Sequence, residues 1–396
     1  MNPSQRWPAR LMMFKQIHIA LWLLLALCLG ITACGGDDGL VSPDNSSLVT
    51  DTAEIDSNYE YQLPVIFHVL YKDQSDPRQY IPAARLKNLL QYVNEIYQGG
   101  IYGKSENLHL KFVLAEKNEA GKKLGTPGVE YVKYDGEYPI DVNAFMSDNT
   151  GANVKYIWDP NQYINVLMYN FKSSSANEVT LGISHMPHTV DNRVEGLDNV
   201  KTQYIAKSQL KYPLCSSINS IYAAQSSEGG YFQSDRYTNA NHATTNLNTA
   251  DVVVTMAHEL GHYLGLYHAF TEHEQDGSYQ PVDSCGDTDY CKDTPSYNRI
   301  EYNNYLESLI GNHNNPNTTQ MMLSRSSCDG KTFESDNIMD YSLTMGFQIT
   351  ADQKKRIRNV LYYSPLIPGP KKNNINTRTR ATDDSHPLDL RFTIIK

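Results

Sequence analysis

Three histidines and one glutamate stand at fixed spacing in residues 258–268, which read His-Glu-Leu-Gly-His-Tyr-Leu-Gly-Leu-Tyr-His. On a helix with 3.6 residues per turn, His258 and His262 lie one above the other on one face, with Glu259 beside them. Gly265 can adopt a positive φ and end the helix, so that His268 can approach the same point. The pattern predicts Zn²⁺ bound by three imidazoles with a fourth position open, and Glu259 as the base that activates a zinc-bound water.

Two simpler explanations of this pattern are weaker. A chance occurrence is rare once the glycine and the third histidine are included, even in a chain with 12 His and 24 Gly residues. A structural zinc site usually recruits cysteine at short spacing, and residues 258–268 contain none. A catalytic metal site is therefore favoured.

The helix that carries the first two histidines has an apolar face and several candidate caps. Apolar residues recur at steps of three and four, which predicts a buried face opposite the histidines. Asn248, Thr249 and Asp251 are all suitable N-caps, and the sequence does not choose among them. The apolar face comprises Val253, Met256, Ala257, Leu260 and Leu264.

Further along the chain, residues 337–342 read Asn-Ile-Met-Asp-Tyr-Ser. With the zinc-binding pattern upstream, this segment resembles the Met-turn of the metzincin clan of zinc endopeptidases. The resemblance implies that Met339 forms a hydrophobic floor beneath the metal. It also implies that Tyr341 approaches the metal and hydrogen-bonds the developing oxyanion. An ordinary loop with a core methionine and a tyrosine is the alternative.

Within that clan the chain looks most like the pappalysin-like branch. The features are Asp293-Thr294-Pro295 before the Met-turn, the Asn-x-Met-Asp-Tyr form of the turn, and Gln353 in a following helix. The resemblance covers residues 251–361, but residues 269–285 depart from it, so no substrate preference is carried over. It implies an α+β fold with a mixed sheet, a backing helix, an active-site helix, and a C-terminal subdomain with the Met-turn and a closing helix.

Segments upstream of the histidines fit this fold. β-forming residues predict strands at 61–71, 108–114, 163–169 and 180–184. The last strand lies where metzincins carry an edge strand that pairs with extended substrate. A long helix should begin near Pro82, with an inner face formed by Leu86, Leu89, Leu90, Val93 and Ile96.

Downstream, Thr350 and Gln353 form a capping-box pattern ahead of Ile357, Val360 and Leu361. This pattern predicts the closing helix under the Met-turn. After residue 365 the composition changes to Pro, Lys, Asn, Arg and Thr. We expect a catalytic domain at 59–365 and a short appendage or loosely held tail at 366–396.

The N-terminal residues predict an exported lipoprotein. Arg6, Arg10 and Lys15 precede an apolar stretch, and Ile-Thr-Ala leads directly into Cys34, an arrangement that resembles bacterial lipoprotein signals. We expect a signal peptide at 1–33 and a flexible tether at 34–58 with lipid on Cys34. An uncleaved membrane helix is the alternative, but the apolar stretch is short for a span. The chain should therefore be lipid-anchored in the bacterial envelope, at the outer membrane or cell surface.

Four cysteines remain once the signal and the lipidated residue are set aside: Cys215, Cys285, Cys291 and Cys328. An even number in an oxidising compartment predicts two disulfides with three possible pairings. We favour Cys291 with Cys328 and Cys215 with Cys285. Free buried thiols are the alternative.

Carboxylates crowd the loop at residues 286–294, which favours a hard cation with oxygen ligands. Pappalysin-like relatives hold calcium in this region, which makes Asp287, Asp289, Asp293 and Thr294 candidate Ca²⁺ ligands. An acidic solvated turn is the alternative.

Charge and motif together set the expected function. A formal net charge of −10 without a basic patch argues against nucleic-acid binding. We expect a monomeric zinc endopeptidase that acts on proteins of the envelope or the extracellular space and meets the membrane only through its N-terminal lipid. Two rival hypotheses are a surface binding or adhesion lipoprotein of the same fold without turnover, and a protease limited to glycosylated substrates.

Overall fold

β1 (Tyr61–Tyr71) lies in the interior of a mixed sheet and pairs with strands on both sides. The structure, a computed structural model, describes residues 58–173, 179–225, 251–275, 278–310, 318–341, 343–369 and 387–396. Val65 and Phe67 on one face of β1 and Ile66 on the other have no exposed surface, as expected for a strand covered on both faces. The predicted signal peptide, Cys34 and all of the predicted tether except its last residue lie outside the described residues.

The sheet is parallel at one end and mixed beyond it. Its order is β2-β1-β4-β8-β5-β13-β10-β9, and β3 also pairs with β1. β1 is parallel to β2, β3 and β4, and β4 is parallel to β8, whereas β5 runs antiparallel to β8. The strands are β2 (Leu110–Leu114), β3 (Val129–Lys133), β4 (Ile164–Tyr169), β5 (Gly182–His185), β8 (Ser216–Asn219), β9 (Glu272–Gln275), β10 (Ser278–Pro281) and β13 (Ile394–Ile395).

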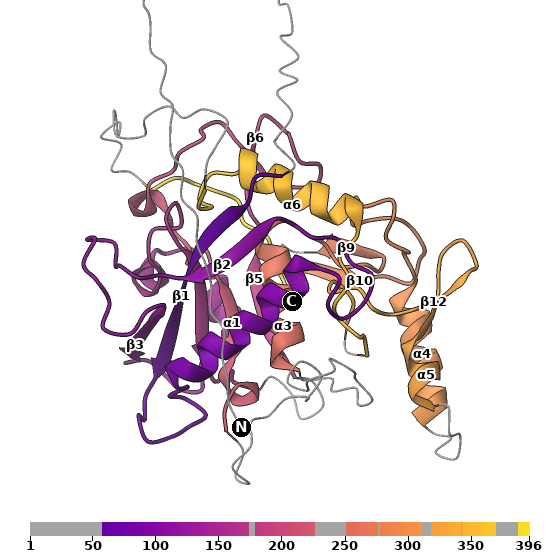
Figure 1. The fold of residues 1–396 in the computed structure, drawn as a ribbon, viewed down its shortest axis with the longest axis horizontal. Coiled ribbons are helices and arrows are strands. Elements are labelled where there is room, and N and C mark those ends of the chain that lie inside the picture. Colours follow the sequence, from indigo (N-terminus) through magenta and orange to yellow (C-terminus); the bar gives the residue numbers. More distant parts are fainter. Residues whose placement is uncertain are drawn as a thin grey trace, which may run out of the picture. The chain divides into compact units, whose positions relative to one another are not determined.

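Two helices, α1 (Ala83–Gln98) and α3 (Val252–Tyr263), lie side by side against this sheet (Figure 1). The Tyr97 hydroxyl on α1 donates to the Ala257 carbonyl on α3 at 3.0 Å. Pro82 is the N-cap of α1, in agreement with the predicted start near this residue. The five predicted inner-face residues of α1 are all buried. α1 therefore backs the helix that carries the histidines.

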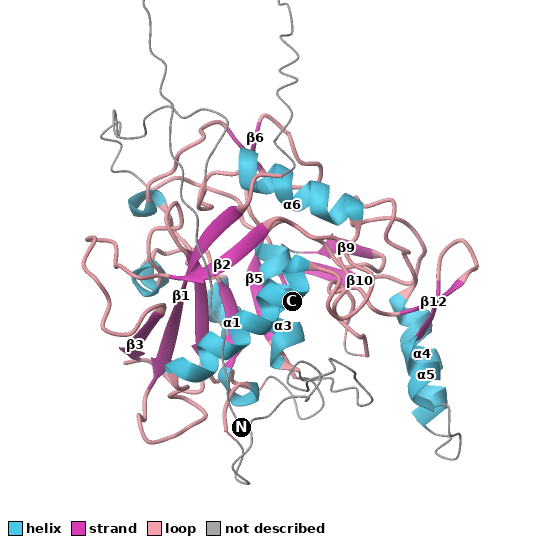
Figure 2. Ribbon diagram, in the orientation of Figure 1, coloured by secondary structure: helices cyan, strands magenta, loops and turns pink. Residues whose placement is uncertain are grey.

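The chain after α3 builds a second group of elements, which Figure 2 shows to be rich in loops. It contains α4 (Arg299–Ile310), α5 (Thr318–Leu323), the hairpin β11 (Ser324–Ser326) and β12 (Thr332–Glu334), and α6 (Ala351–Tyr363). α6 begins with the predicted capping box, in which the Gln353 amide donates to the Thr350 hydroxyl at 3.3 Å. The α+β class, with mixed sheet, backing helix and closing helix, is confirmed.

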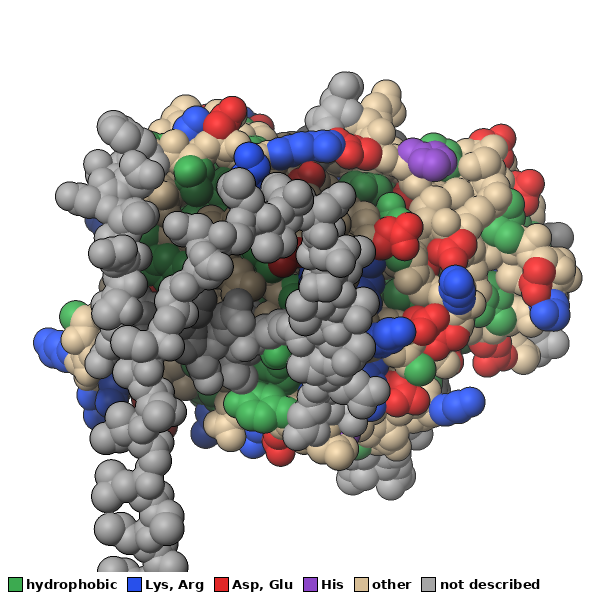
Figure 3. All heavy atoms as spheres, turned by 90° about the horizontal axis from the view of Figure 1, so that it is seen from above, with side chains coloured by type: hydrophobic (Ala, Val, Ile, Leu, Met, Phe, Trp, Pro, Cys, Tyr) green, Lys and Arg blue, Asp and Glu red, His purple; other side chains and the backbone are tan. Residues whose placement is uncertain are grey.

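Smaller elements complete the described fold. They are α2 (Val142–Met146), β6 (Thr189–Val190) paired with β7 (Asn199–Val200), and the 3₁₀ turns Ala152–Tyr156, Lys207–Gln209 and Ser220–Tyr222. Among the described residues, no helix combines the length and the apolar character needed to span a bilayer. On the face seen in Figure 3, acidic and basic side chains are interspersed.

The C-terminal residues depart from our expectation of an appendage or loosely held tail. β13 is an internal strand of the sheet, antiparallel to β5 and parallel to β10. Ile395 has no exposed surface, and Leu388, Leu390 and Phe392 pack against the main core. The apolar residues of β13 pair with β5, which lies far away in sequence, and composition alone does not reveal such a contact.

Candidate metal centre and active site

α3 presents the first two histidines because both of its ends are fixed by local chemistry. Of the three candidate N-caps, Asp251 accepts from the Val253 amide at 2.9 Å, whereas Asn248 and Thr249 lie outside the described residues. At the other end Gly265 has φ of 91°, and the amides of Gly265 and Leu266 donate to the carbonyls of His262 and Gly261. This pair of hydrogen bonds is a Schellman motif, and it turns the chain back toward the side of α3 that carries the histidines.

The three histidine rings converge on one point. Nε2 of His262 lies 2.9 Å from Nε2 of His258 and 3.1 Å from Nε2 of His268. In the described part of the chain these are the one group of three His, Cys, Asp or Glu side chains placed to hold an ion together. His258 and His262 are as buried as the apolar residues of α3, so the helix is enclosed on both faces and not only on the predicted one.

The hydrogen bonds behind the rings make this cluster suited to a cation. The Nδ1 atoms of His258 and His262 meet the carbonyl oxygens of Ile338 and Leu266, each at 2.7 Å. A carbonyl can only accept, so Nδ1 carries the hydrogen in both rings and Nε2 presents a lone pair. Burial lowers the pKa of His258 to about 3, which keeps that ring neutral. Lone pairs this close repel one another without a cation, and zinc matches the imidazole donors.

His268 is oriented by a residue that sequence reasoning missed. Its Nδ1 lies 2.7 Å from Oε2 of Glu272, and both side chains are buried. Glu272 opens β9, in the segment that departs from the family pattern. An acidic residue four positions after a candidate ligand was the available signal, since carboxylate–histidine pairs commonly orient metal ligands.

Glu259 faces the backbone of β5 across a very short gap. A Cβ atom at Gly182 would lie 2.5 Å from both Cγ and Oε1 of Glu259, so only glycine leaves the carboxylate in place. Among the described residues, Oε2 of Glu259 has no hydrogen-bond partner although it is buried. Without a cation nearby, burial raises the pKa of Glu259 well above its ordinary value, and the positive charge of a bound Zn²⁺ would oppose this shift. The carboxylate is thus positioned by packing, with one oxygen free for a ligand.

Met339 lies beneath α3 and is fully buried. Its own amide donates to Oδ1 of Asn337 at 2.9 Å, and its carbonyl accepts from the Ala269 amide at 3.0 Å. Asn337 in turn exchanges two 3.0 Å amide hydrogen bonds with Gln353 on α6. Gln353, singled out by the family resemblance, therefore joins the Met-turn to the closing helix.

Asp340 anchors the Met-turn from the other side and was not singled out by sequence. Its Oδ1 accepts from the Tyr341 amide at 2.7 Å and from the Tyr297 hydroxyl at 2.5 Å. Its Oδ2 accepts from the Ser335 hydroxyl and lies 3.3 Å from Nε of the buried Arg325. A buried carboxylate with this many partners fixes the turn rigidly.

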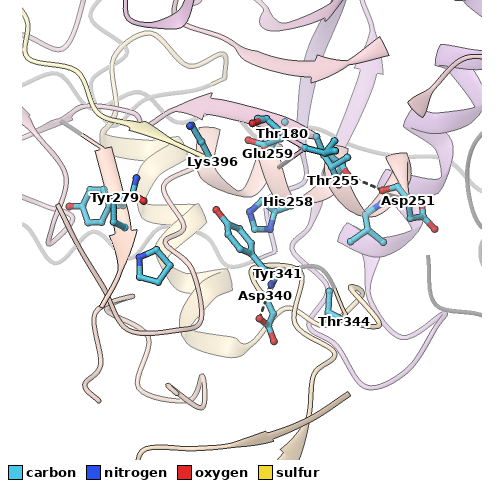
Figure 4. A pocket seen from close by; sticks show the side chains of 16 residues that line it. Thr180, Asp251, Thr255, His258, Glu259, Tyr279, Asp340, Tyr341, Thr344 and Lys396 are labelled. Atoms are coloured by element: carbon cyan, nitrogen blue, oxygen red, sulfur yellow. Dashed lines mark hydrogen bonds between the residues drawn. The ribbon is translucent and has the colours of Figure 1, made fainter. Parts of the chain in front are cut away.

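Tyr341 lies beside the histidine cluster, as the family resemblance implied. Its ring centroid is 4.5 Å from that of His268 and 5.7 Å from that of His258. Figure 4 shows Glu259 on one side of a cavity and Tyr341 on the other, with His258 between them. The cavity holds about 330 Å³ and is also lined by Gly182, Tyr279, Thr344 and Lys396. The guanidinium of Arg299 stacks 4.4 Å from the Tyr341 ring centroid, a contact that sequence reasoning missed.

The acidic loop gives no support to the calcium expectation. Oδ2 of Asp293 accepts from the Asp352 amide in the first turn of α6, and Thr294 lies 3.4 Å from the Thr350 hydroxyl. Asp289 accepts from the Cys291 amide, and burial raises the pKa of its carboxyl to about 8. Neither Asp287 nor these residues join a three-residue metal cluster in the described regions. Asp293 and Thr294 instead dock the loop on α6.

The favoured disulfide pairing is wrong. Cys285 is bonded to Cys328, with the two Cα atoms 5.4 Å apart, and Cys215 and Cys291 are free and buried. Cys215 immediately precedes β8 in the main core, where its sulfur lies 3.6 Å from Sδ of Met146. Cys215 is therefore buried in the core, away from the exposed loop that carries Cys285, and the two cannot pair. The alternative of free buried thiols thus holds for two of the four cysteines.

Three convergent imidazoles, an adjacent glutamate, a tight turn with a buried methionine, and a mixed sheet are the combination found in metzincin-type zinc metalloproteases. Residues 232–362 match the family model Peptidase_M43, described as Pregnancy-associated plasma protein-A. This segment is similar to that pappalysin family, in agreement with the resemblance inferred from sequence.

Among solved structures the chain is similar to mirolysin. Tannerella forsythia mature mirolysin in complex with a cleaved peptide shares 17% identity at a TM-score of 0.44, with 76% of this chain and 90% of that chain covered. Mirolysin in complex with a small compound shares 18% at 0.45, covering 76% and 92%. A Tannerella forsythia promirolysin mutant shares 17% at 0.43, covering 76% and 81%. No curated protein matches the chain.

Proposed function

We propose that the chain is an endopeptidase that cleaves proteins of the bacterial envelope or extracellular space, with zinc held by His258, His262 and His268. The observation that carries this proposal is the set of Nε2 lone pairs facing one another at 2.9 and 3.1 Å. When bound there, zinc would supply Lewis acidity that lowers the pKa of a water toward neutrality. The chain's own side chains then handle the protons and the substrate.

Glu259 is the proton carrier in this proposal. Its unpartnered Oε2 takes a proton from the attacking water and later delivers it to the departing amine. Gly182 keeps the carboxylate facing the cavity because any side chain there would displace it. The Tyr341 hydroxyl, on the opposite wall, donates to the oxygen that becomes negative as the scissile carbonyl is attacked.

The lipid anchor remains a proposal that rests on sequence alone. Basic residues, an apolar stretch and small residues before Cys34 support export and lipidation, and the acidic and polar residues after it suit a tether. Metabolic labelling with a fatty acid, compared between the chain and Cys34→Ser, tests it. Loss of label in the variant is expected, and equal labelling would contradict the anchor.

A peptide library decides among the candidate functions. Residues 53–396, which form a compact unit, would be incubated with diverse peptides with and without a chelator. Cleavage that stops with chelator and returns with zinc supports the proposal. A binding or adhesion module would leave every peptide intact, and a protease limited to glycosylated substrates would cut only the sugar-bearing members.

A further inference from the structure

The outer edge of β5 is occupied by the protein's own C-terminal residues. β13 pairs antiparallel with β5, with Ile394 opposite His185 and Ile395 opposite Ser184. The Met186 amide donates to the Thr393 carbonyl at 2.9 Å and extends this ladder. The family resemblance implies that the strand predicted at 180–184 pairs with extended substrate. In the structure, a segment of the chain lies where the substrate is expected.

This edge leads directly to the proposed base. β5 begins at Gly182, which lies against Glu259, and the Ser184 hydroxyl donates to the Glu259 carbonyl at 2.8 Å. A strand paired with β5 is therefore guided toward the cavity. The residue after β13, Lys396, lines that cavity together with His258 and Glu259. Figure 4 shows Lys396 between Tyr279 and Glu259.

The opposite side of the segment is also bounded by a strand. Ser278 of β10 pairs with Ile394, and the next residues of β10, Tyr279 and Gln280, line the cavity. β13 is thus enclosed between β5 and β10, as an extended peptide that joins a sheet would be. Backbone pairing on both sides with side chains entering pockets is how grooves of this kind bind peptides by strand addition.

The side chains of residues 392–396 alternate between partly exposed and buried, as those of an extended peptide bound in a sheet would. Thr393 and Ile395 are buried, whereas Phe392, Ile394 and Lys396 are partly exposed. Upstream, the Arg391 carbonyl accepts from Nε2 of His188 at 2.7 Å, and the Arg391 guanidinium pairs with Glu274 on β9. Exposed ion pairs contribute little, so most of the hold on the segment comes from backbone pairing and the two buried side chains.

We propose that residues 391–396 are an intramolecular occupant of the peptide groove, which substrate must displace before cleavage. The inference rests on the proposed endopeptidase function. Because the segment is covalently tethered, it competes at an effective concentration on the order of millimolar. Its sequence also indicates the ligand class: an extended peptide with β-branched aliphatic residues opposite Ser184 and His185, followed by a basic residue at the cavity.

Kinetics on the full chain separate an occupant from a structural strand. Ile395→Glu places a charge in a buried site and should release the segment. Release should lower KM for a peptide substrate by about tenfold while kcat stays within about twofold, because only the competent fraction changes. Ile395→Val keeps a β-branched apolar residue and should retain the wild-type KM. An unchanged KM in Ile395→Glu would overturn the proposal, as would a loss of kcat together with a lower Tm.

Binding in the absence of turnover gives an independent readout. A fluorescent peptide with the sequence of residues 391–396 would be titrated onto Glu259→Gln with and without Ile395→Glu, using anisotropy. We expect binding to the double variant, at least about tenfold weaker binding when Ile395 is intact, and none of a scrambled peptide. Equal affinity for both proteins, or no binding to either, would refute the assignment.

The two experiments also distinguish this inference from the proposed function. If no peptide is cleaved by wild type or Ile395→Glu, the endopeptidase proposal fails, whereas the anisotropy titration still decides whether the groove takes the segment. If peptides are cleaved equally well by both proteins, the endopeptidase proposal stands and the occupant is rejected.

Discussion

A Cβ atom built on Gly261 would lie 2.6 Å from the sulfur of Met339. Gly261 stands between Glu259 and His262 on α3, so the helix rests on the Met-turn at the level of the metal cluster. Met339 is fully buried and cannot move aside freely. The contact between α3 and the Met-turn therefore requires a residue without a Cβ atom at position 261.

We predict that Gly261→Ala displaces Met339 and destabilises the protein by about 1–3 kcal/mol, the usual cost of overfilling a packed core. Thermal unfolding would measure this loss, and chelator competition would show whether zinc affinity falls with it. Gly125→Ala is the matched control because a Cβ there meets nothing within 4 Å. A Tm equal to wild type in Gly261→Ala would show that the turn adapts.

Glu259→Gln should retain stoichiometric zinc and lose hydrolysis by about a hundredfold to ten-thousandfold or more, because an amide cannot accept the water's proton. Elemental analysis and peptide cleavage measure the two properties on one sample. Glu116→Gln, at an exposed position, should leave both unchanged. Full activity in Glu259→Gln would remove the base assignment.

Glu272→Gln should weaken zinc binding by about 10–100-fold, since the charged acceptor of the His268 Nδ1 hydrogen is lost. His268→Ala should weaken it further by removing the ligand itself. Competition with a chromophoric chelator would rank the variants. Glu301→Gln on the exposed surface of α4 serves as the control. Wild-type affinity in His268→Ala would show that the third ligand is misassigned.

Tyr341→Phe should lower kcat by about a hundredfold with KM nearly unchanged, because the hydroxyl acts only as charge develops on the substrate oxygen. The phenylalanine ring keeps its stacking with Arg299, so folding and metal content should be preserved. Tyr305→Phe, at an exposed tyrosine, controls for the loss of a phenol. A kcat equal to wild type would mean that Tyr341 has no part in the reaction.

His185 on β5 predicts a pH-dependent loss of stability. Burial lowers the pKa of His185 to about 4, and its Nε2 lies 2.9 Å from the Met146 carbonyl. The folded state thus binds this proton less readily than the unfolded chain, whose histidine pKa is about 6.5. The contribution of neutral His185 is intact above pH 6.5 and is lost as pH falls to about 4, by roughly 3 kcal/mol.

Chemical denaturation across that pH range tests the His185 effect as a difference between variants. His185→Gln keeps a donor for the Met146 carbonyl and should flatten the dependence between pH 4 and 6.5. His273→Gln, at an exposed position, should leave the wild-type dependence in place. Parallel curves for wild type and His185→Gln would show that His185 does not carry the effect.

Local signals in the sequence were sufficient for several elements. The apolar run of β-forming residues placed β1 at its observed bounds, and the capping box placed the start of α6. Gly265 predicted the turn that ends α3, because only a positive φ lets the chain reverse there. In each case the cause and the element lie within a few residues of one another.

Long-range pairings were not predictable in the same way. One partner of β5 is β13, which lies far along the chain, and a two-residue strand has no periodicity to detect. Arg299 reaches the site only through the fold, so its spacing from the histidines carries no motif. The predicted disulfide pairing was wrong for a related reason, because the tertiary fold decides which cysteines lie close enough to bond.

The Gln353 side chain takes part in two separate structural features, the start of α6 and the Met-turn. Oε1 of Gln353 accepts from the Thr350 amide at 3.0 Å, which initiates α6, and from Asn337, which holds the methionine floor. α6 and the Met-turn beneath the histidine cluster are consequently one cooperative unit. Any residue at 353 chosen to improve helix initiation alone would unsettle the metal centre, although it never approaches the ion.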